Sequence, residues 1–171
     1  MKEKSSNRTL RNRVIFCAVV VFWFVLDRVT KIYFEEHALD LLFAPPRLDG
    51  IVELSIVHNY GAAWGSFSGM VDILIVVTAA LCILIAYYAF RVSKDASLLE
   101  MIGLSLVFAG GVGNLFDRLT RGYVLDFIEP LFIDFPTFNI ADIGITCGII
   151  CVIIAFALRF FREEKPMQDK G

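Results

Sequence analysis

The chain alternates between long apolar blocks and short polar segments. Residues 14–26 and 143–158 carry no charge, residues 73–90 are apolar apart from Thr78, and residues 98–116 are interrupted only by Glu100, Ser105 and Asn114. A helix needs about 20 residues to cross the ~30 Å of hydrocarbon in a bilayer. The second and third blocks are long enough alone, while the first and last require residues 27–34 and 139–142 to continue their helices. The pattern predicts four transmembrane helices, at about residues 13–34, 70–90, 98–116 and 140–161.

The segment between the first two predicted helices has a weaker strand signal. From Ile51 to His58 polar and apolar residues partly alternate, and Asn59-Tyr60-Gly61 has the composition of a turn. Trp64 and Phe67, which follow, suit a membrane interface. The predicted fold class is therefore an all-α membrane protein, with four transmembrane helices and a small extracytoplasmic β-sheet between helices 1 and 2. Residues 1–171 form one domain, with a disordered charged tail at about 163–171.

Composition and charge support a membrane protein with a defined orientation. Hydrophobic residues make up 57% of the chain, above the roughly 45–50% of soluble domains. If the N-terminus is cytoplasmic, 11 of the 16 Lys and Arg residues lie in the N-terminal tail, the 91–97 loop and the tail from Arg159. This distribution obeys the positive-inside rule and predicts that both termini are cytoplasmic. Both larger loops are then expected to face outward.

Two other interpretations of the basic N-terminus are less consistent with the sequence. A cleaved secretory signal has a basic start and an apolar core, but no small-x-small cleavage site follows here. A tail that binds nucleic acid is disfavoured because five spread charges beside a membrane helix are the ordinary topology signal. The four cysteines lie inside predicted spans without metal-binding spacing, and the two histidines are isolated. We therefore expect no nucleic-acid partner, no metal site and no cofactor.

Polar residues gather where the predicted helices meet the outer membrane face, and each has more than one interpretation. Asp27 and Lys31 share a helix face. They form either an ion pair at the helix end, with the lysine reaching outward, or the support of an active-site wall. Asn59 either completes a tight turn or clamps a substrate backbone. Asn114 and Arg118 are four residues apart, so they share a helix face, and they lie at the same membrane depth as the carboxylates. Five glycines are expected to allow close helix packing: Gly110, Gly111, Gly113, Gly144 and Gly148.

Asp142 combines a structural role with a possible chemical one. Asn139 and Asp142 have the spacing of an N-cap and an acid at the third helical position, which the helix dipole favours. The helix then enters apolar sequence at once, so Asp142 is expected to be partly desolvated. A second carboxyl nearby would allow one acid to be protonated while the other is ionised, as aspartic peptidase chemistry requires. Spacing leaves the second acid open among Asp27, Asp117, Asp126 and Asp134; alternatively, Asp117 forms a simple ion pair with Arg118.

Five motifs in chain order resemble those of the bacterial lipoprotein signal peptidases, the type II signal peptidases. Asp27-Arg28-Val29-Thr30-Lys31 is similar to D-x-x-[ST]-K, Asn59-Tyr60-Gly61-Ala62-Ala63-Trp64 to N-x-G-A-A-F, Gly110 to Arg118 to G-x-x-G-N-L-x-D-R, Val124 to Phe127 to V-x-D-F, and Phe138-Asn139-Ile140-Ala141-Asp142 to F-N-x-A-D. The resemblance extends from helix 1 to helix 4. Trp64 replaces the usual phenylalanine, which affects the shape of the substrate groove and leaves the chemistry untouched.

The resemblance implies a metal-free aspartyl endopeptidase of the bacterial inner membrane. By similarity, Asp126 and Asp142 are the catalytic pair, and the site is surrounded or supported by Asp27, Lys31, Asn59, Gly61, Asn114, Arg118, Asn139 and Ala141. The family fold has four transmembrane helices and an extracytoplasmic β-cradle. The implied substrates are prolipoproteins, cut just before a cysteine that already carries a diacylglyceryl group, and membrane lipids are the other partners.

Two other function classes remain as alternatives. A proton-coupled transporter uses buried acids as a relay, but such proteins usually place their charges near the midplane and carry inverted repeats. No internal repeat is visible here, and the polar groups cluster at the outer edge. A non-enzymatic membrane scaffold would not require paired carboxylates at two helix ends. A pH profile of proteolysis distinguishes a peptidase from a transporter.

Overall fold

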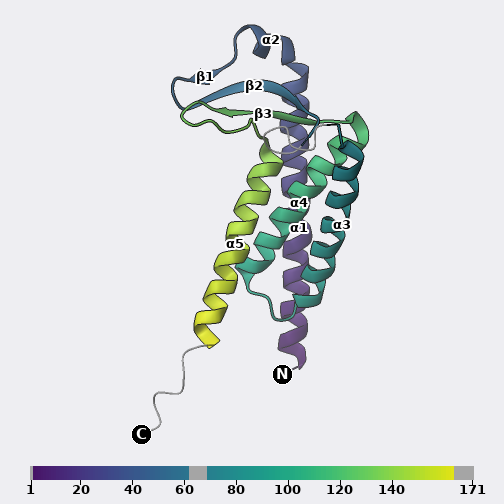
Figure 1. Cartoon of the computed structure of the whole chain (residues 1–171). Coiled ribbons are helices and arrows are strands. Elements are labelled where there is room, and N and C mark those ends of the chain that lie inside the picture. The colour runs from purple at the N-terminus through teal and green to yellow at the C-terminus, as the bar shows by residue number, and fades with distance from the viewer. Residues whose placement is uncertain (1, 62–68, 164–171) are drawn as a thin grey trace.

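The computed structural model describes residues 2–61 and 69–163. The helices are α1 (Lys2–Glu36), α2 (Ala38–Phe43), α3 (Val71–Val92), α4 (Leu98–Arg121) and α5 (Ile140–Glu163), and the strands are β1 (Arg47–Leu48), β2 (Val52–Asn59) and β3 (Val124–Pro130). The long helices form a bundle, and the strands form a layer across the end of the bundle farthest from the N-terminus (Figure 1). Trp64, Phe67 and the tail after Glu163 lie outside the described residues.

Two helices extend well beyond the expected bounds. α1 begins at Lys2 instead of about residue 13. α4 continues past Phe116 to Arg121 and ends at Gly122, which has a positive φ of 77° and donates its N–H to Arg118 O. Glycine adopts this left-handed conformation without the penalty that a Cβ atom brings. Asp117 and Arg118 are therefore helical residues instead of loop residues, and their side chains leave α4 in different directions.

Within the described ranges, three helices are long and apolar enough to cross a membrane: α3, α4 and residues 140–162 of α5. This supports a multi-pass membrane protein. The expected count of four spans is not confirmed, because α1 is not among the three. Its charge-free stretch is 13 residues long and lies between Arg13 and Asp27, which is shorter than the hydrocarbon thickness requires.

α4 is the central helix of the bundle and packs against α1, α3 and α5. The predicted packing role of the glycines is confirmed at the contact between α4 and α5. A Cβ atom on Gly148 would lie 2.6 Å from Gly103 O and 2.8 Å from Val107 N. A Cβ atom on Gly110 would meet the backbone of Ala141, the residue before Asp142. The two backbones therefore approach each other along the helices and at the end of the bundle that carries the sheet.

The sheet is antiparallel with the strand order β1-β2-β3. The expected strand at 51–58 is confirmed as β2, whereas β3 was not predicted. β3 comes from the segment between α4 and α5, and its register places Asn59 opposite Val124 and Val57 opposite Asp126. The ladder shifts between Leu54 and Val57, as at a β-bulge, which bends a strand and redirects its side chains. The first and second outer segments thus form one layer.

The close contact at Gly148 gives a test of the bundle. Gly148→Ala places a methyl group against two backbone atoms that cannot move independently of α4. We expect a loss of about 1–3 kcal/mol of unfolding free energy, the usual cost of overpacking, measured as a lower thermal unfolding midpoint in detergent. Ile149→Ala on the exposed face of α5 is the control and should change the midpoint little. Equal midpoints for the two variants would contradict the packing role.

Candidate active site

The two acids of the candidate site come from different layers of the molecule. Asp126 lies on β3 and is 2% exposed. Asp142 is the third residue of α5 and is partly buried. The expectation that both acids sit at helix ends is therefore wrong for Asp126, because β2 and β3 form a ladder that sequence spacing does not reveal.

The predicted cap of α5 is confirmed and holds Asp142 in place. The backbone N–H of Asn139 donates to Asp142 Oδ2 at 3.0 Å, and the backbone N–H of Asp142 donates to Asn139 Oδ1 at 3.1 Å. This reciprocal pair is a capping box, which satisfies two N–H groups that a helix start otherwise leaves unpaired. The carboxylate of Asp142 is thereby fixed at the positive end of the helix dipole.

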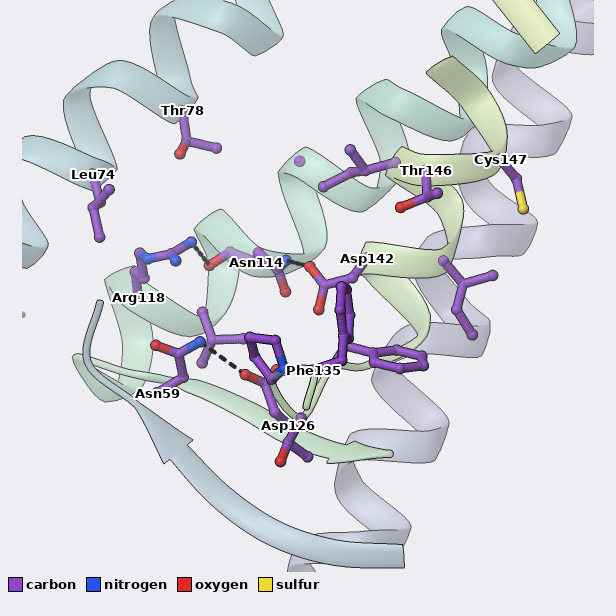
Figure 2. A pocket seen from close by; sticks show the side chains of 17 residues that line it. Asn59, Leu74, Thr78, Asn114, Arg118, Asp126, Phe135, Asp142, Thr146 and Cys147 are labelled. Carbon is purple, nitrogen blue, oxygen red and sulfur yellow. Dashed lines mark hydrogen bonds between the residues drawn. The ribbon is translucent and has the colours of Figure 1, made fainter. Parts of the chain in front are cut away.

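The side-chain amide of Asn139 connects this cap to the second acid. Its Nδ2 donates to Asp126 Oδ1 at 2.6 Å and to Asn114 Oδ1 at 3.1 Å. Asn114 in turn donates from Nδ2 to Asp142 Oδ1 at 2.7 Å (Figure 2). The two asparagines therefore bridge the two acids, and each amide is oriented by an acceptor on one side and a donor on the other.

Asn59 holds Asp126 from the sheet side. Its Nδ2 donates to Asp126 Oδ2 at 2.9 Å (Figure 2), and its Oδ1 accepts the N–H of Gly61 at 2.9 Å. The turn predicted at Asn59 is present, since an Asn side chain that accepts from the backbone two residues later forms such a turn. The carbonyl of Gly61 accepts from Arg118 Nη2 at 2.9 Å, which ties the turn to α4.

A cluster of buried charges lies behind the acids. Lys31 is 0% exposed, and its Nζ lies 3.0 Å from Asp27 Oδ1 and 2.7 Å from Asp117 Oδ2. The same ammonium donates to Asn114 Oδ1 at 3.1 Å. The interpretation of Lys31 as a lysine that reaches outward is wrong, because both carboxylates that attract it lie inside the bundle. The interpretation of Asp117 as an ion pair with Arg118 is also wrong, because the carboxylate of Asp117 pairs with Lys31 and Arg28 instead.

Arg28 completes this cluster and was not identified from the sequence. Its Nη2 and Nη1 lie 2.6 Å from Asp27 Oδ2 and Asp117 Oδ1, respectively. Its guanidinium lies over the rings of Phe24 and Phe116, at 5.7 Å and 5.0 Å from their centroids, a favourable cation–π geometry. The signal in the sequence was Asp117 itself, an acid beside an apolar block. Its two nearest cations, Arg28 and Lys31, are supplied by α1, and Arg121 of α4 lies farther away at 3.4 Å.

The charge cluster also fixes the start of α5. Asp27 Oδ1 accepts the backbone N–H of Ala141 at 3.1 Å. A Cβ atom on Gly113 would lie 2.8 Å from Asp27 Oδ2, so the glycine makes room for this carboxylate. The structure thus joins every sequence-predicted site residue through hydrogen bonds or ion pairs, from Asp27 and Lys31 to the two acids.

The surroundings of Asp126 change its protonation. Burial raises the pKa of Asp126 to about 7, and the negative charge of Asp142 adds to the rise. Hydrogen bonds from Asn59 and Asn139 and the positive charge of Lys31 oppose it. The ordinary pKa of an aspartate is about 3.9, so Asp126 keeps a proton at pH values where an exposed aspartate has lost it.

Both acids border a cavity of about 580 Å³. Its charged and amide lining comes from Asn59, Asn114, Arg118, Asp126 and Asp142, and Thr78, Thr137 and Thr146 add hydroxyls. Its apolar lining includes Leu74, Val124, Phe135, Phe138, Ile143 and Ile145. Arg118 Nε is buried and has no hydrogen-bond partner in the part of the chain that the structure describes. Among those residues, no group of three His, Cys, Asp or Glu side chains is placed to hold a metal ion. The arrangement can hold a water and a polar substrate group between two acids.

The buried charges predict a specific pattern of stability. Lys31→Met leaves Arg28 as the one cation that contacts both Asp27 and Asp117. Removing one partner of a buried ion pair typically lowers the unfolding free energy by about 3–5 kcal/mol. Adding Asp117→Asn removes the excess negative charge, so the double variant should have a higher thermal unfolding midpoint than Lys31→Met alone. Lys94→Met, at an exposed lysine, is the control and should behave like the unmodified protein. A Lys31→Met variant as stable as this control would contradict the role of the cluster.

Comparison with known proteins agrees with this geometry. A sequence model of the family described as signal peptidase (SPase) II matches residues 19–158. The lipoprotein signal peptidase of Fusobacterium nucleatum is 30% identical over 168 residues, which cover 98% of this chain and 100% of that protein. That of Enterococcus faecalis is 36% identical over 156 residues, which cover 91% of this chain and 93% of that protein.

A solved structure described as a bacterial membrane enzyme has a similar fold. It superimposes with a TM-score of 0.76 at 29% identity, and the match covers 91% of this chain and 94% of the other. The family model spans most of the chain, the sequence relatives match almost end to end, and the folds agree. The chain therefore belongs to the signal peptidase II family.

Proposed function

We propose that this protein is an aspartyl endopeptidase of the bacterial inner membrane, which removes signal peptides from prolipoproteins by cutting just before a diacylglyceryl-modified cysteine. Membership of the signal peptidase II family makes the chain a hydrolase of lipoprotein processing. The observation that supports the two-acid mechanism is the pair of carboxyls, Asp126 and Asp142, which border one cavity and are bridged by Asn139.

In the proposed reaction the two acids share one proton and hold a water between them. The ionised acid takes a proton from the water, whose oxygen bonds to the carbonyl carbon of the scissile peptide. The protonated acid gives its proton to the carbonyl oxygen as negative charge develops there. The tetrahedral intermediate then collapses, the C–N bond breaks, and a proton passes to the leaving amine. This mechanism needs no cofactor, because the two carboxyls carry every proton.

The supporting residues divide into two groups by position. Asp27, Lys31, Asn139 and Ala141 lie behind the acids, and Asn114 borders the cavity beside them; these residues orient the acids through the contacts given above. Asn59 and Arg118 line the cavity, where they would bind the substrate backbone, and Gly61 supports them through its bonds to both side chains. The free donor on Arg118 Nε supports this second role, since a backbone carbonyl is an acceptor of suitable chemistry.

The proposed substrate suits a cavity at this depth. A signal peptide is an apolar helix that already lies in the bilayer, and an attached diacylglyceryl group anchors the cut position at one leaflet. Lipid anchoring thus supplies much of the positioning, which lowers the entropic cost of bringing the peptide bond to the acids. The site would lie near the outer, periplasmic face, at the end of the bundle that carries the sheet (Figure 1).

The two acids give the first test. Asp126→Asn and Asp142→Asn should each abolish cleavage, because neither amide can exchange a proton with the water. Gel mobility of a prolipoprotein with and without the diacylglyceryl cysteine measures the reaction, and only the lipidated form should be cut. Asp134→Asn, at an exposed acid of the same loop, is the matched control and should retain activity. Cleavage by either dyad variant at comparable protein levels would refute the assignment.

The raised pKa of Asp126 predicts the pH dependence. Because the pKa lies near 7, the shared proton is present below about pH 7 and is lost as the pH rises through that value. We expect kcat/KM to fall on the alkaline side with a midpoint near 7, tenfold per pH unit well above it. Initial rates in mixed micelles at constant ionic strength measure this, with unfolding followed in parallel. Activity that stays constant up to pH 9 would contradict a protonated Asp126.

A further inference from the structure

The cavity at the two acids continues into the bundle as a groove with α4 as its floor. α3 and α5 lie on opposite flanks of α4 (Figure 1). On α4 the lining residues Arg118, Asn114 and Gly111 follow each other at intervals of one turn. The walls show the same spacing. α3 lines one wall with Leu74 and Thr78, and α5 lines the other with Asp142 and Thr146, each pair being four residues apart (Figure 2). The groove therefore leads from the acids toward the membrane interior.

The hydroxyls of Thr78 and Thr146 are unusual within this groove. Neither has a hydrogen-bond partner among residues 2–61 and 69–163. A threonine in a helix commonly bonds to the carbonyl one turn earlier, as Thr30 does with Leu26 O at 2.9 Å and Thr120 with Phe116 O at 2.8 Å. Thr78, which is half-buried, and Thr146, which is exposed, make no such bond. Each wall of the groove therefore contributes one hydroxyl that is free among the described residues.

A peptide substrate that reaches the acids has backbone carbonyl groups that need hydrogen-bond donors. The peptide around the cut position must be extended for water to attack its carbonyl carbon, so the signal-peptide helix ends before that point. A helix end leaves its last four carbonyl groups without intrahelical partners. An unpaired backbone group is strongly disfavoured in hydrocarbon, so donors at this depth would favour the bound, partly unwound peptide.

The spacing places Thr146 at the depth of one such carbonyl. Thr146 follows Asp142 by four residues, which is about 6 Å along the axis of α5. An extended chain advances by roughly 3.3 Å per residue, so two residues cover the same distance. The carbonyl of the third residue before the cut therefore reaches the depth of Thr146 when the scissile carbonyl lies between the acids.

We propose that the hydroxyls of Thr78 and Thr146 donate hydrogen bonds to backbone carbonyls that are freed where the signal-peptide helix ends. The inner end of the cavity is thus the binding site for the C-terminal turn of that helix. This inference rests on the proposed function and adds two substrate-binding residues to it. The contact forms with the bound substrate and persists through the reaction, so it contributes to KM more than to kcat.

Kinetics of hydroxyl-deleted variants test the proposal. Valine has nearly the shape of threonine without the hydroxyl, so Thr78→Val and Thr146→Val should each raise KM by about 2- to 10-fold with kcat unchanged, the range expected for one hydrogen bond. Thr78→Ser and Thr146→Ser keep the donor and should restore KM. Thr120→Val, at a threonine outside the groove, should leave both constants unchanged. An unchanged KM in the double valine variant would overturn the proposal.

The substrate can identify the acceptor. A prolipoprotein peptide with an ester in place of the amide after the third residue before the cut has a weaker carbonyl acceptor. It should lose affinity for the unmodified protein and lose little more with Thr146→Val. A dialkylglyceryl substrate, which has no lipid carbonyls, should show the same valine penalty; disappearance of the penalty would assign the hydroxyls to the lipid instead and overturn the inference.

These outcomes are separable from failure of the proposed function. If the unmodified protein cleaves the lipidated substrate and Asp142→Asn does not, the proposed function stands whatever the valine variants do. If the unmodified protein leaves every prolipoprotein uncut in conditions where a Fusobacterium nucleatum relative works, the proposed function fails and this inference fails with it. Thermal unfolding midpoints of all variants separate a binding defect from a folding defect.

Discussion

Asn139 makes hydrogen bonds to both acids, and the rest of the site is arranged around it. Its backbone N–H and side-chain Oδ1 form the cap that holds Asp142, while its Nδ2 reaches Asp126 on the neighbouring strand. A helix cap is a local structure that sequence encodes strongly. Here the capping residue carries a second donor across to the sheet, so the start of α5 and the position of β3 are set by one side chain.

The second constraint is electrical neutrality in a medium of low polarity. Asp27 and Asp117 are buried opposite Lys31 and Arg28, at ion-pair distances of 2.6–3.0 Å. Charges removed from water are tolerated when each is paired and hydrogen-bonded. The cluster joins α1 to α4 and, through Ala141 N, to α5. Lys31 also orients Asn114, which transmits the arrangement of the buried charges to Asp142.

The sequence predicted features that depend on local spacing and missed those that depend on distant pairing. The cap at Asn139 and Asp142 and the packing glycines were predicted because helix starts and small residues in apolar blocks have local signals. β3 was missed because its partner β2 lies more than sixty residues earlier, and register cannot be derived from either strand alone. Arg28 and Asp117 are 89 residues apart, so the sequence offered only the neighbouring Arg118 as an ion-pair partner and left Asp117 open as a second acid. The choice of Asp126 came from family resemblance, since spacing left four acids open.

The division of the site between two layers has a mechanical consequence. Asp126 belongs to the sheet that crosses the end of the bundle, and Asp142 belongs to the bundle itself (Figure 1). Any force that lifts the sheet from the helix ends, such as a change in bilayer thickness or surface tension, would separate the acids while every helix and strand stayed intact. The distance between the two carboxyls is therefore set by how the two layers dock, and not by the internal structure of either layer.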